Sequence, residues 1–163
     1  LLLRADVLGE RSEVLETSAF SDVTIGVKGQ PESVLHAMKK LDGYRVLRPV
    51  MTPTSLEAEG WVMREGVPGF RQVSCVKRPL EDATAEKEAQ LSPLLQAIYS
   101  DGLTHVSVFI EPFHAGRHTR TVLASVGATQ TLTQRHGEWW ITAVGDVPPA
   151  TLRKFANGLE RKK

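Results

Sequence analysis

The chain has 163 residues, of which 41% are hydrophobic and 24% are charged, and its formal net charge is +1. These values are ordinary for a globular protein with one full domain, or with one small domain and a piece of another. So small a net charge provides no global field for nucleic acid or for a membrane surface. No apolar run approaches the roughly 20 residues of a membrane-spanning helix. We therefore expect no nucleic-acid partner.

The N-terminus indicates that the chain is part of a longer protein. It begins Leu1-Leu2-Leu3-Arg4, without Met and without the basic segment, long apolar core and small-residue cleavage site of a signal peptide. The single cysteine, Cys75, cannot form an internal disulfide, so both the cytosol and the bacterial periplasm remain open as compartments.

The N-terminal third predicts a β-hairpin followed by a short helix and a strand. Residues 2–8 and 14–25 are extended and apolar, with turn residues between them, and a lone hairpin of this kind is marginal in water. Pro31 begins a helical pattern over 31–41, and 44–48 returns to a strand pattern.

The stretch around residues 51–60 changes in character. It contains Pro, Ser, Thr and charged residues and has no apolar period, which is typical of a linker. We predict a first domain over 1–51, a linker over 52–59 and a second domain over 60–163.

The second domain is dense in strand patterns. They fall near 61–64, 70–78, 94–99, 104–111, 120–127, 129–135 and 138–144. The short spacings favour antiparallel pairing. The chain then closes with an amphipathic helix that has a cap candidate among 146–151. Leu152, Phe155, Ala156 and Leu159 form its apolar stripe, and the basic residues 161–163 complement its C-terminal end. These features predict an α+β fold, an antiparallel sheet of about six strands with the C-terminal helix on one face.

The motif Ser100-Asp101-Gly102 lies between two alternating runs. Asp-Gly at such a place predicts a hairpin turn of type I′, which needs positive φ at both central residues. Alternatively, Ser100 with His105 as its base would form a nucleophile, but no Gly-x-Ser-x-Gly elbow is present. We favour the turn.

Metal and cofactor signals are weak. His114 and His118 have the i,i+4 spacing of a helical zinc site, but Gly116 between them indicates a loop and no third ligand is evident. Gly26-Val27-Lys28-Gly29 lacks the spacing of a phosphate-binding loop. We therefore predict no metal, no cofactor, no catalytic residues and no enzymatic activity.

A basic cluster beside two adjacent tryptophans is the candidate partner-binding site. Neighbouring strand residues point to opposite faces, so one tryptophan can lie in the core while the other anchors an interface. A helix packed on the second face would bury both tryptophans. For the basic residues, the alternative is a solvated loop face. The candidate residues are Arg117, His118, Arg120, Trp139 and Trp140.

Five blocks in this order resemble the C-terminal domain of the RseB/MucB family. They are GWV at 60–62, VPGF at 67–70, YSDGL at 99–103, VSVFIEP at 106–112 and VGDVP at 144–148. The blocks are mostly turns and core strands, so they transfer no residue-level binding motif.

Residues 1–50 are similar to the end of that family's larger N-terminal domain. That domain is a LolA/LolB-like half-open barrel, so residues 1–51 would be its C-terminal remnant.

The resemblance implies a periplasmic negative regulator of the sigma-E envelope stress response. Such proteins bind the periplasmic region of a membrane-anchored anti-sigma factor (RseA/MucA-like) and shield it from proteolysis. The full-length protein would also have a lipid or lipopolysaccharide ligand. The alternative is a periplasmic lipid or lipoprotein carrier, or a lipid-sensing module. An exposed hairpin edge would favour a homo-oligomer.

Overall fold

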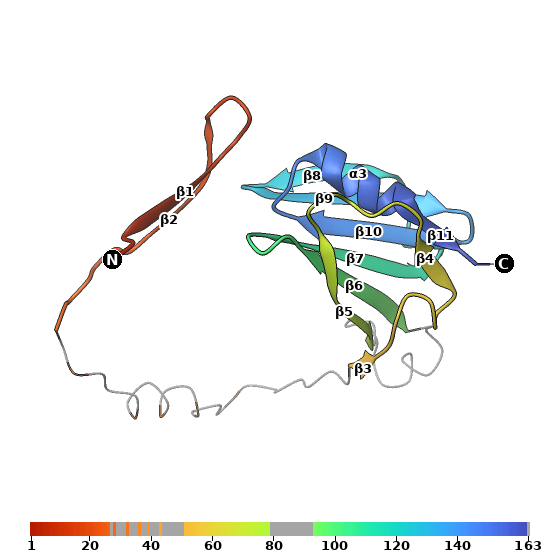
Figure 1. Cartoon of the computed structure of the whole chain (residues 1–163), viewed down its shortest axis with the longest axis horizontal. Helices are drawn as coiled ribbons and strands as arrows, with labels where there is room; N and C mark the ends of the chain where they lie inside the picture. The colour runs from red at the N-terminus through yellow and green to blue at the C-terminus, as the bar shows by residue number, and fades with distance from the viewer. Residues whose placement is uncertain are drawn as a thin grey trace. The chain divides into compact units, whose positions relative to one another are not determined.

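The computed structural model describes residues 1–26, 51–78 and 93–162, with a few single positions between 27 and 50. The chain divides into two compact units, Leu1–Arg48 and Pro49–Lys163 (Figure 1). The predicted helix over 31–41 and the predicted strand over 44–48 lie outside the described stretches.

The first unit contains the predicted hairpin. Strands β1 (Arg4–Leu8) and β2 (Val14–Ala19) pair antiparallel, and the second strand ends at Ala19 rather than near residue 25. Asp6 accepts hydrogen bonds from Arg4 Nε at 2.9 Å and from Thr17 Oγ1 at 2.7 Å, and both contacts lower the pKa of its carboxyl. Every residue of both strands is exposed.

The second unit is built on a seven-stranded antiparallel sheet with the order β3-β5-β6-β7-β10-β9-β8 (Figure 1). The strands are β3 (Thr52–Pro53), β5 (Arg71–Arg78), β6 (Leu94–Ser100), β7 (His105–Pro112), β10 (Trp139–Gly145), β9 (Thr129–His136) and β8 (Val122–Val126). The predicted strands from 70–78 to 138–144 are confirmed within one or two residues.

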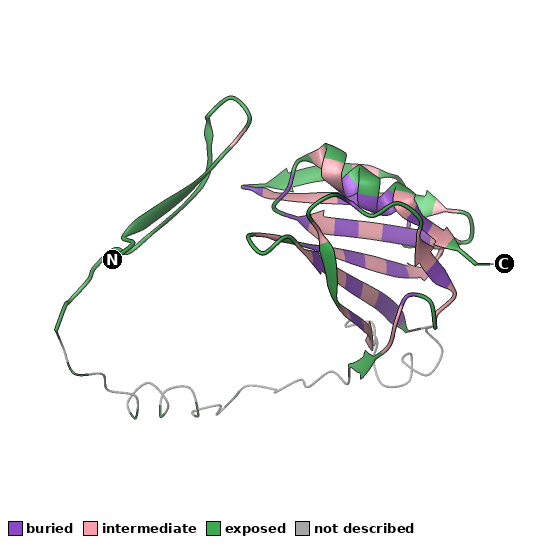
Figure 2. Cartoon of the chain, viewed as in Figure 1, coloured by how far each residue is buried: buried purple, intermediate pink, exposed green. Residues whose placement is uncertain are grey.

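The two faces of this sheet differ in how deeply their residues are buried. Buried and half-buried residues alternate along β6, β7 and β10, which appear as alternating purple and pink bands in Figure 2. The fully buried set includes Val106, Val108 and Ile110 on β7 and Ile141 and Ala143 on β10. These residues define the core face. The opposite face is called the outer face below.

Helix α3 (Pro149–Gly158) packs on the core face against β9, β10 and β7. Leu152, Phe155 and Ala156 are its buried residues, and the Phe155 ring lies 4.9 Å from the ring of Tyr99 on β6. The α+β arrangement with one C-terminal helix on the sheet is therefore confirmed.

Two details of the predicted helix are wrong. Pro148 occupies the cap position without a side-chain hydrogen bond, while the Asp146 carboxylate accepts a hydrogen bond from Thr129 instead. The helix ends at Gly158, and the basic residues do not extend it. The next residues form β11 (Leu159–Arg161), which pairs with β4 (Trp61–Met63) and buries Leu159 completely.

Residues 52–59, predicted to be a linker, are part of the second unit's structure. Thr52 and Pro53 pair with Lys77 and Val76 as the edge strand β3. The following turn inserts Leu56, which is 1% exposed, into the core. The segment has the composition of a linker because Leu56 is its only large apolar residue.

The motif that joins β6 to β7 is a hairpin connection, as predicted, but it is not a type I′ turn. Only Gly102 has positive φ, at 96°, and the loop spans residues 101–104. The Asp101 carboxylate accepts hydrogen bonds from the N–H groups of Leu103 and Thr104 at 2.9 and 2.8 Å. Ser100 Oγ donates to the Thr104 carbonyl at 2.7 Å, so the hydroxyl is part of the turn.

Candidate functional site

The two adjacent tryptophans lie on opposite faces of the sheet, as the strand alternation predicted. Trp139 packs against the core cluster, whereas Trp140 lies on the outer face. Trp140 is nevertheless only 7% exposed. Of the two alternatives, an exposed anchor and a covered second face, Trp140 therefore fits the covered face. The cover comes from the loop that follows β7, because helix α3 lies on the other face.

The loop after β7 forms a cluster of stacked rings on the outer face. His118 stacks on Trp140 with ring centroids 4.7 Å apart and planes inclined by 5°. Phe113 lies 6.1 Å from Trp140, and the Arg135 guanidinium is 3.9 Å from the Phe113 ring centroid. Arg135 and Trp140 are direct cross-strand partners, so the sheet register positions this cluster.

His118 is held by two polar contacts in this cluster. Its Nδ1 accepts a hydrogen bond from the His114 N–H at 2.9 Å, and its Nε2 lies 3.4 Å from a carboxylate oxygen of Glu111. Burial lowers the pKa of His118, and Arg117 and His114 act in the same direction, while Glu111 opposes them. The neutral imidazole with its proton on Nε2 satisfies both contacts.

The remaining predicted residues occupy different environments. Arg117 forms an ion pair with Glu111 at 3.0 Å, so it belongs to the same cluster. Arg120 is exposed and contacts no other described residue through a hydrogen bond or an ion pair. The structure therefore brings Arg117, His118 and Trp140 together, and it separates them from Trp139.

Trp139 belongs to a second aromatic group on the core face. Its ring lies 5.5 Å from that of Trp61 in an edge-to-face arrangement. Arg161 is the ladder partner of Trp61, and its guanidinium is 4.3 Å from the Trp139 ring centroid and 5.6 Å from that of Trp61. The pairing of β11 with β4 thus places a cation over two tryptophans.

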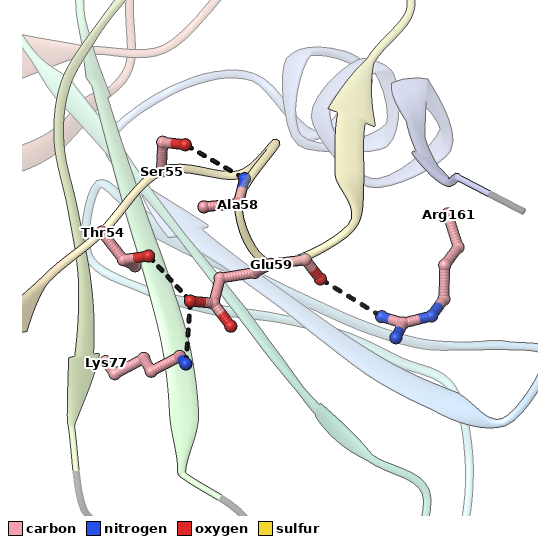
Figure 3. Close-up of polar contacts among 6 residues, drawn as sticks. All are labelled: Thr54, Ser55, Ala58, Glu59, Lys77 and Arg161. Atoms are coloured by element: carbon pink, nitrogen blue, oxygen red, sulfur yellow. Dashed lines mark hydrogen bonds and ion pairs between the residues drawn. The ribbon is translucent and has the colours of Figure 1, made fainter.

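An ion pair between Lys77 and Glu59 lies near this aromatic group. Lys77 Nζ is 2.8 Å from Glu59 Oε1, and Thr54 Oγ1 donates to the same oxygen at 2.7 Å (Figure 3). The contacts with Lys77 and Thr54 lower the pKa of Glu59, so this carboxyl is ionised. Figure 3 also shows Arg161 directed toward the main-chain carbonyl of Glu59, at 3.5 Å.

The aromatic group and the ion pair enclose a pocket of about 260 Å³. Leu95 and Ile110, which are cross-strand partners, belong to its lining. We call it the Trp139 pocket. Its lining residues are Glu59, Trp61, Lys77, Pro93, Leu95, Ile110, Trp139 and Arg161.

Sequence reasoning missed most of this pocket. Trp61 and Arg161 are separated by 100 positions, and only the β4–β11 ladder brings them together. The resemblance of the GWV block was the one signal that pointed to Trp61. The local pattern predicts that the C-terminal helix ends in basic residues that include Arg161. The pairing of Arg161 with Trp61 could therefore not be predicted from the sequence.

Both clusters are built from aromatic and charged side chains. Within residues 1–26, 51–78 and 93–162, no group of three His, Cys, Asp or Glu residues could hold a metal ion. Trp and Arg are enriched among the residues that dominate the energetics of protein interfaces, and Trp61, Trp139 and Arg161 line the pocket. In the same described stretches, no helix is long and apolar enough to cross a membrane. The fold and the site therefore define a small α+β domain whose surface is suited to binding.

The comparisons assign this domain to a family. The model of the MucB/RseB C-terminal domain matches residues 55–160, and the chain belongs to this family. A search of curated proteins found no match.

Two solved structures share the fold. The structure described as the complex of Pseudomonas aeruginosa MucA/MucB is 22% identical, with a TM-score of 0.68 over 99% of this chain and 50% of that chain. A crystal structure of MucB is 21% identical, with a TM-score of 0.57 over 98% of this chain and 48% of that chain. The chain thus spans about half the length of the structures it matches.

Proposed function

We propose that the chain is the C-terminal half of a regulatory protein that binds the periplasmic region of a membrane-anchored anti-sigma factor. Binding would shield the anti-sigma factor from proteolysis and so keep sigma-E activity low. The observation that carries this proposal is the family match over residues 55–160. A solved structure with this fold is described as a complex of MucA with MucB, which supports a protein partner.

The two units correspond to different parts of such a regulator. In this proposal, residues 52–163 are the C-terminal domain, with β3 and Leu56 as parts of it, and residues 1–51 are the end of a LolA/LolB-like domain. The match to MucB structures extends over 99% of the chain and so includes the first unit. The exposed apolar residues of β1 and β2, such as Val7, Leu8 and Leu15, support a larger sheet around this hairpin.

A protease-protection assay tests the proposal. The full-length regulator is mixed with the periplasmic region of its anti-sigma factor and with the protease that makes the first cut. We expect protection by the full-length protein and its loss when residues 60–163 are deleted. Absence of binding by both this chain and the full-length protein, measured by pull-down, would refute the function.

The same material tests the alternative of a lipid or lipoprotein carrier. A carrier would extract a labelled lipid from vesicles whether or not the anti-sigma factor is present. Lipid transfer without any protection of the anti-sigma factor would favour the carrier.

A further inference from the structure

The Trp139 pocket combines apolar walls with an unevenly charged rim. Leu95, Ile110 and Trp61 are buried residues, and all three line the pocket. Glu59 and Lys77 neutralise each other at 2.8 Å on one side. The rim therefore carries one net positive charge, which Arg161 provides.

Arg161 is available to a ligand. Its side chain is exposed, and among the described residues it donates one hydrogen bond, to the main-chain carbonyl of Glu59 at 3.5 Å, the upper limit of such a contact. No carboxylate of the described residues pairs with it, in contrast to Lys77, Arg64 and Arg117. Its guanidinium is held over the Trp139 ring, so its position at the mouth is defined before a ligand arrives.

The size of the pocket limits what it can hold. Its volume of about 260 Å³ lies below the roughly 300–1,000 Å³ of clefts that enclose drug-sized ligands. A single aromatic or large aliphatic side chain fits such a space, and a long acyl chain does not. A pocket of this size, walled by tryptophan and rimmed by arginine, is typical of the anchor points of peptide interfaces.

We propose that the Trp139 pocket holds one apolar side chain of an acidic peptide segment, with a carboxylate of that segment on Arg161. The proposal rests on the proposed function for the source of the peptide, which is the anti-sigma factor. The site itself follows from the pocket, whatever protein provides the peptide. Charge complementarity selects an acidic segment, because the one uncompensated charge at the rim is positive.

Small probes test the site without reference to any partner. The chain, labelled with ¹⁵N, is titrated with 3-phenylpropionate and with its neutral amide, 3-phenylpropanamide. The indole N–H signals of the three tryptophans report the location of binding. We expect both probes to shift the signals of Trp61 and Trp139 and to leave that of Trp140, on the outer face, unchanged.

The charge preference is the second readout. We expect the acid to bind about three- to tenfold more tightly than the amide, the range between an exposed ion pair and a charged hydrogen bond. Arg161→Ala should bring the acid to the level of the amide. Arg153→Ala, an exposed arginine on α3 that does not line this pocket, is the matched control and should leave the preference intact.

A third titration uses the periplasmic region of the anti-sigma factor. Weaker binding of this polypeptide to Arg161→Ala than to Arg153→Ala would support the proposal. If the parent chain binds it and Arg161→Ala binds it equally well, the peptide does not use this pocket and the proposal is overturned while the proposed function stands.

The probes decide the remaining cases. If neither this chain nor the full-length protein binds the anti-sigma factor but the acid probe shifts Trp61 and Trp139 with the expected charge preference, the proposed function fails and the site is supported. No shift with either probe overturns the site. Tighter binding of dodecanoate than of phenylpropionate at the same signals also overturns it, because the pocket would then hold an acyl chain.

Discussion

Replacing His118 is the sharpest test of the outer-face cluster. His118→Phe keeps a flat ring against Trp140 but removes the acceptor for the His114 N–H, which is bonded at 2.9 Å. An unsatisfied N–H costs about 1–3 kcal/mol. His118→Ala also loses the stack, worth about 0.5–1.5 kcal/mol. We therefore expect a loss of about 1–3 kcal/mol for the Phe variant and about 2–4 kcal/mol for the Ala variant.

The stability that His118 contributes should depend on pH. Burial lowers the pKa of His118 in the folded state, so the unfolded chain takes up a proton at a higher pH than the folded chain does. The stability that His118 contributes is then complete above its ordinary pKa of about 6.5. It is lost as the pH falls through the lowered value. Protonation of Nδ1 would also break the hydrogen bond from His114.

Urea unfolding at pH 7.5 and at pH 5.5, followed by tryptophan fluorescence, measures both effects. The parent chain should lose more stability between these two pH values than His118→Phe does, because the variant cannot take up this proton. Titratable groups distant from His118 are the same in both proteins, so their contributions to the pH dependence cancel. An equal loss of stability in both proteins would refute the role assigned to His118.

Three further predictions concern the core and are measured by urea unfolding at neutral pH. Gly145→Ala should cost about 1–3 kcal/mol, because the new Cβ would lie 2.5 Å from the His105 carbonyl oxygen; a neutral result would contradict that close approach. Tyr99→Phe should be neutral or stabilising by up to about 1 kcal/mol, because burial raises the pKa of the hydroxyl to about 12 and it has no hydrogen-bond partner among the described residues; a loss above about 1 kcal/mol would indicate a partner. Phe155→Ala should cost about 3–5 kcal/mol, because its fully buried ring packs against the rings of Tyr99 and Phe70; a loss below about 1 kcal/mol would place this ring outside the core.

The strands of the second unit could be predicted because their patterns are local. Apolar and polar residues alternate along 94–100 and 105–112, which indicates that one face of each strand is buried. Gly102, which has positive φ, marks the turn between the two strands. The same reasoning identified the apolar stripe of α3 through Leu152 and Phe155. It failed at Leu159, where a residue with helical spacing begins a strand, because pairing with Met63 decides its conformation.

The candidate site could be predicted less completely from the sequence. Arg117, His118 and Trp140 were selected together, and they do meet, but as a closed stack rather than as an exposed patch. Whether a tryptophan is exposed depends on what folds over it. The loop from Phe113 to His118 covers Trp140, and nothing in the composition of that loop requires this.

The resemblance to the family, the α+β class and the positions of most strands could be read from the amino-acid sequence, since turns and alternation arise from neighbours in the chain. Which aromatic residues share a site became evident only in the folded domain. Trp61, Trp139 and Arg161 meet through the β4–β11 ladder and the end of β10, which are contacts between distant segments. Such contacts depend on which segments pack over each face of the sheet, and that packing involves the whole fold.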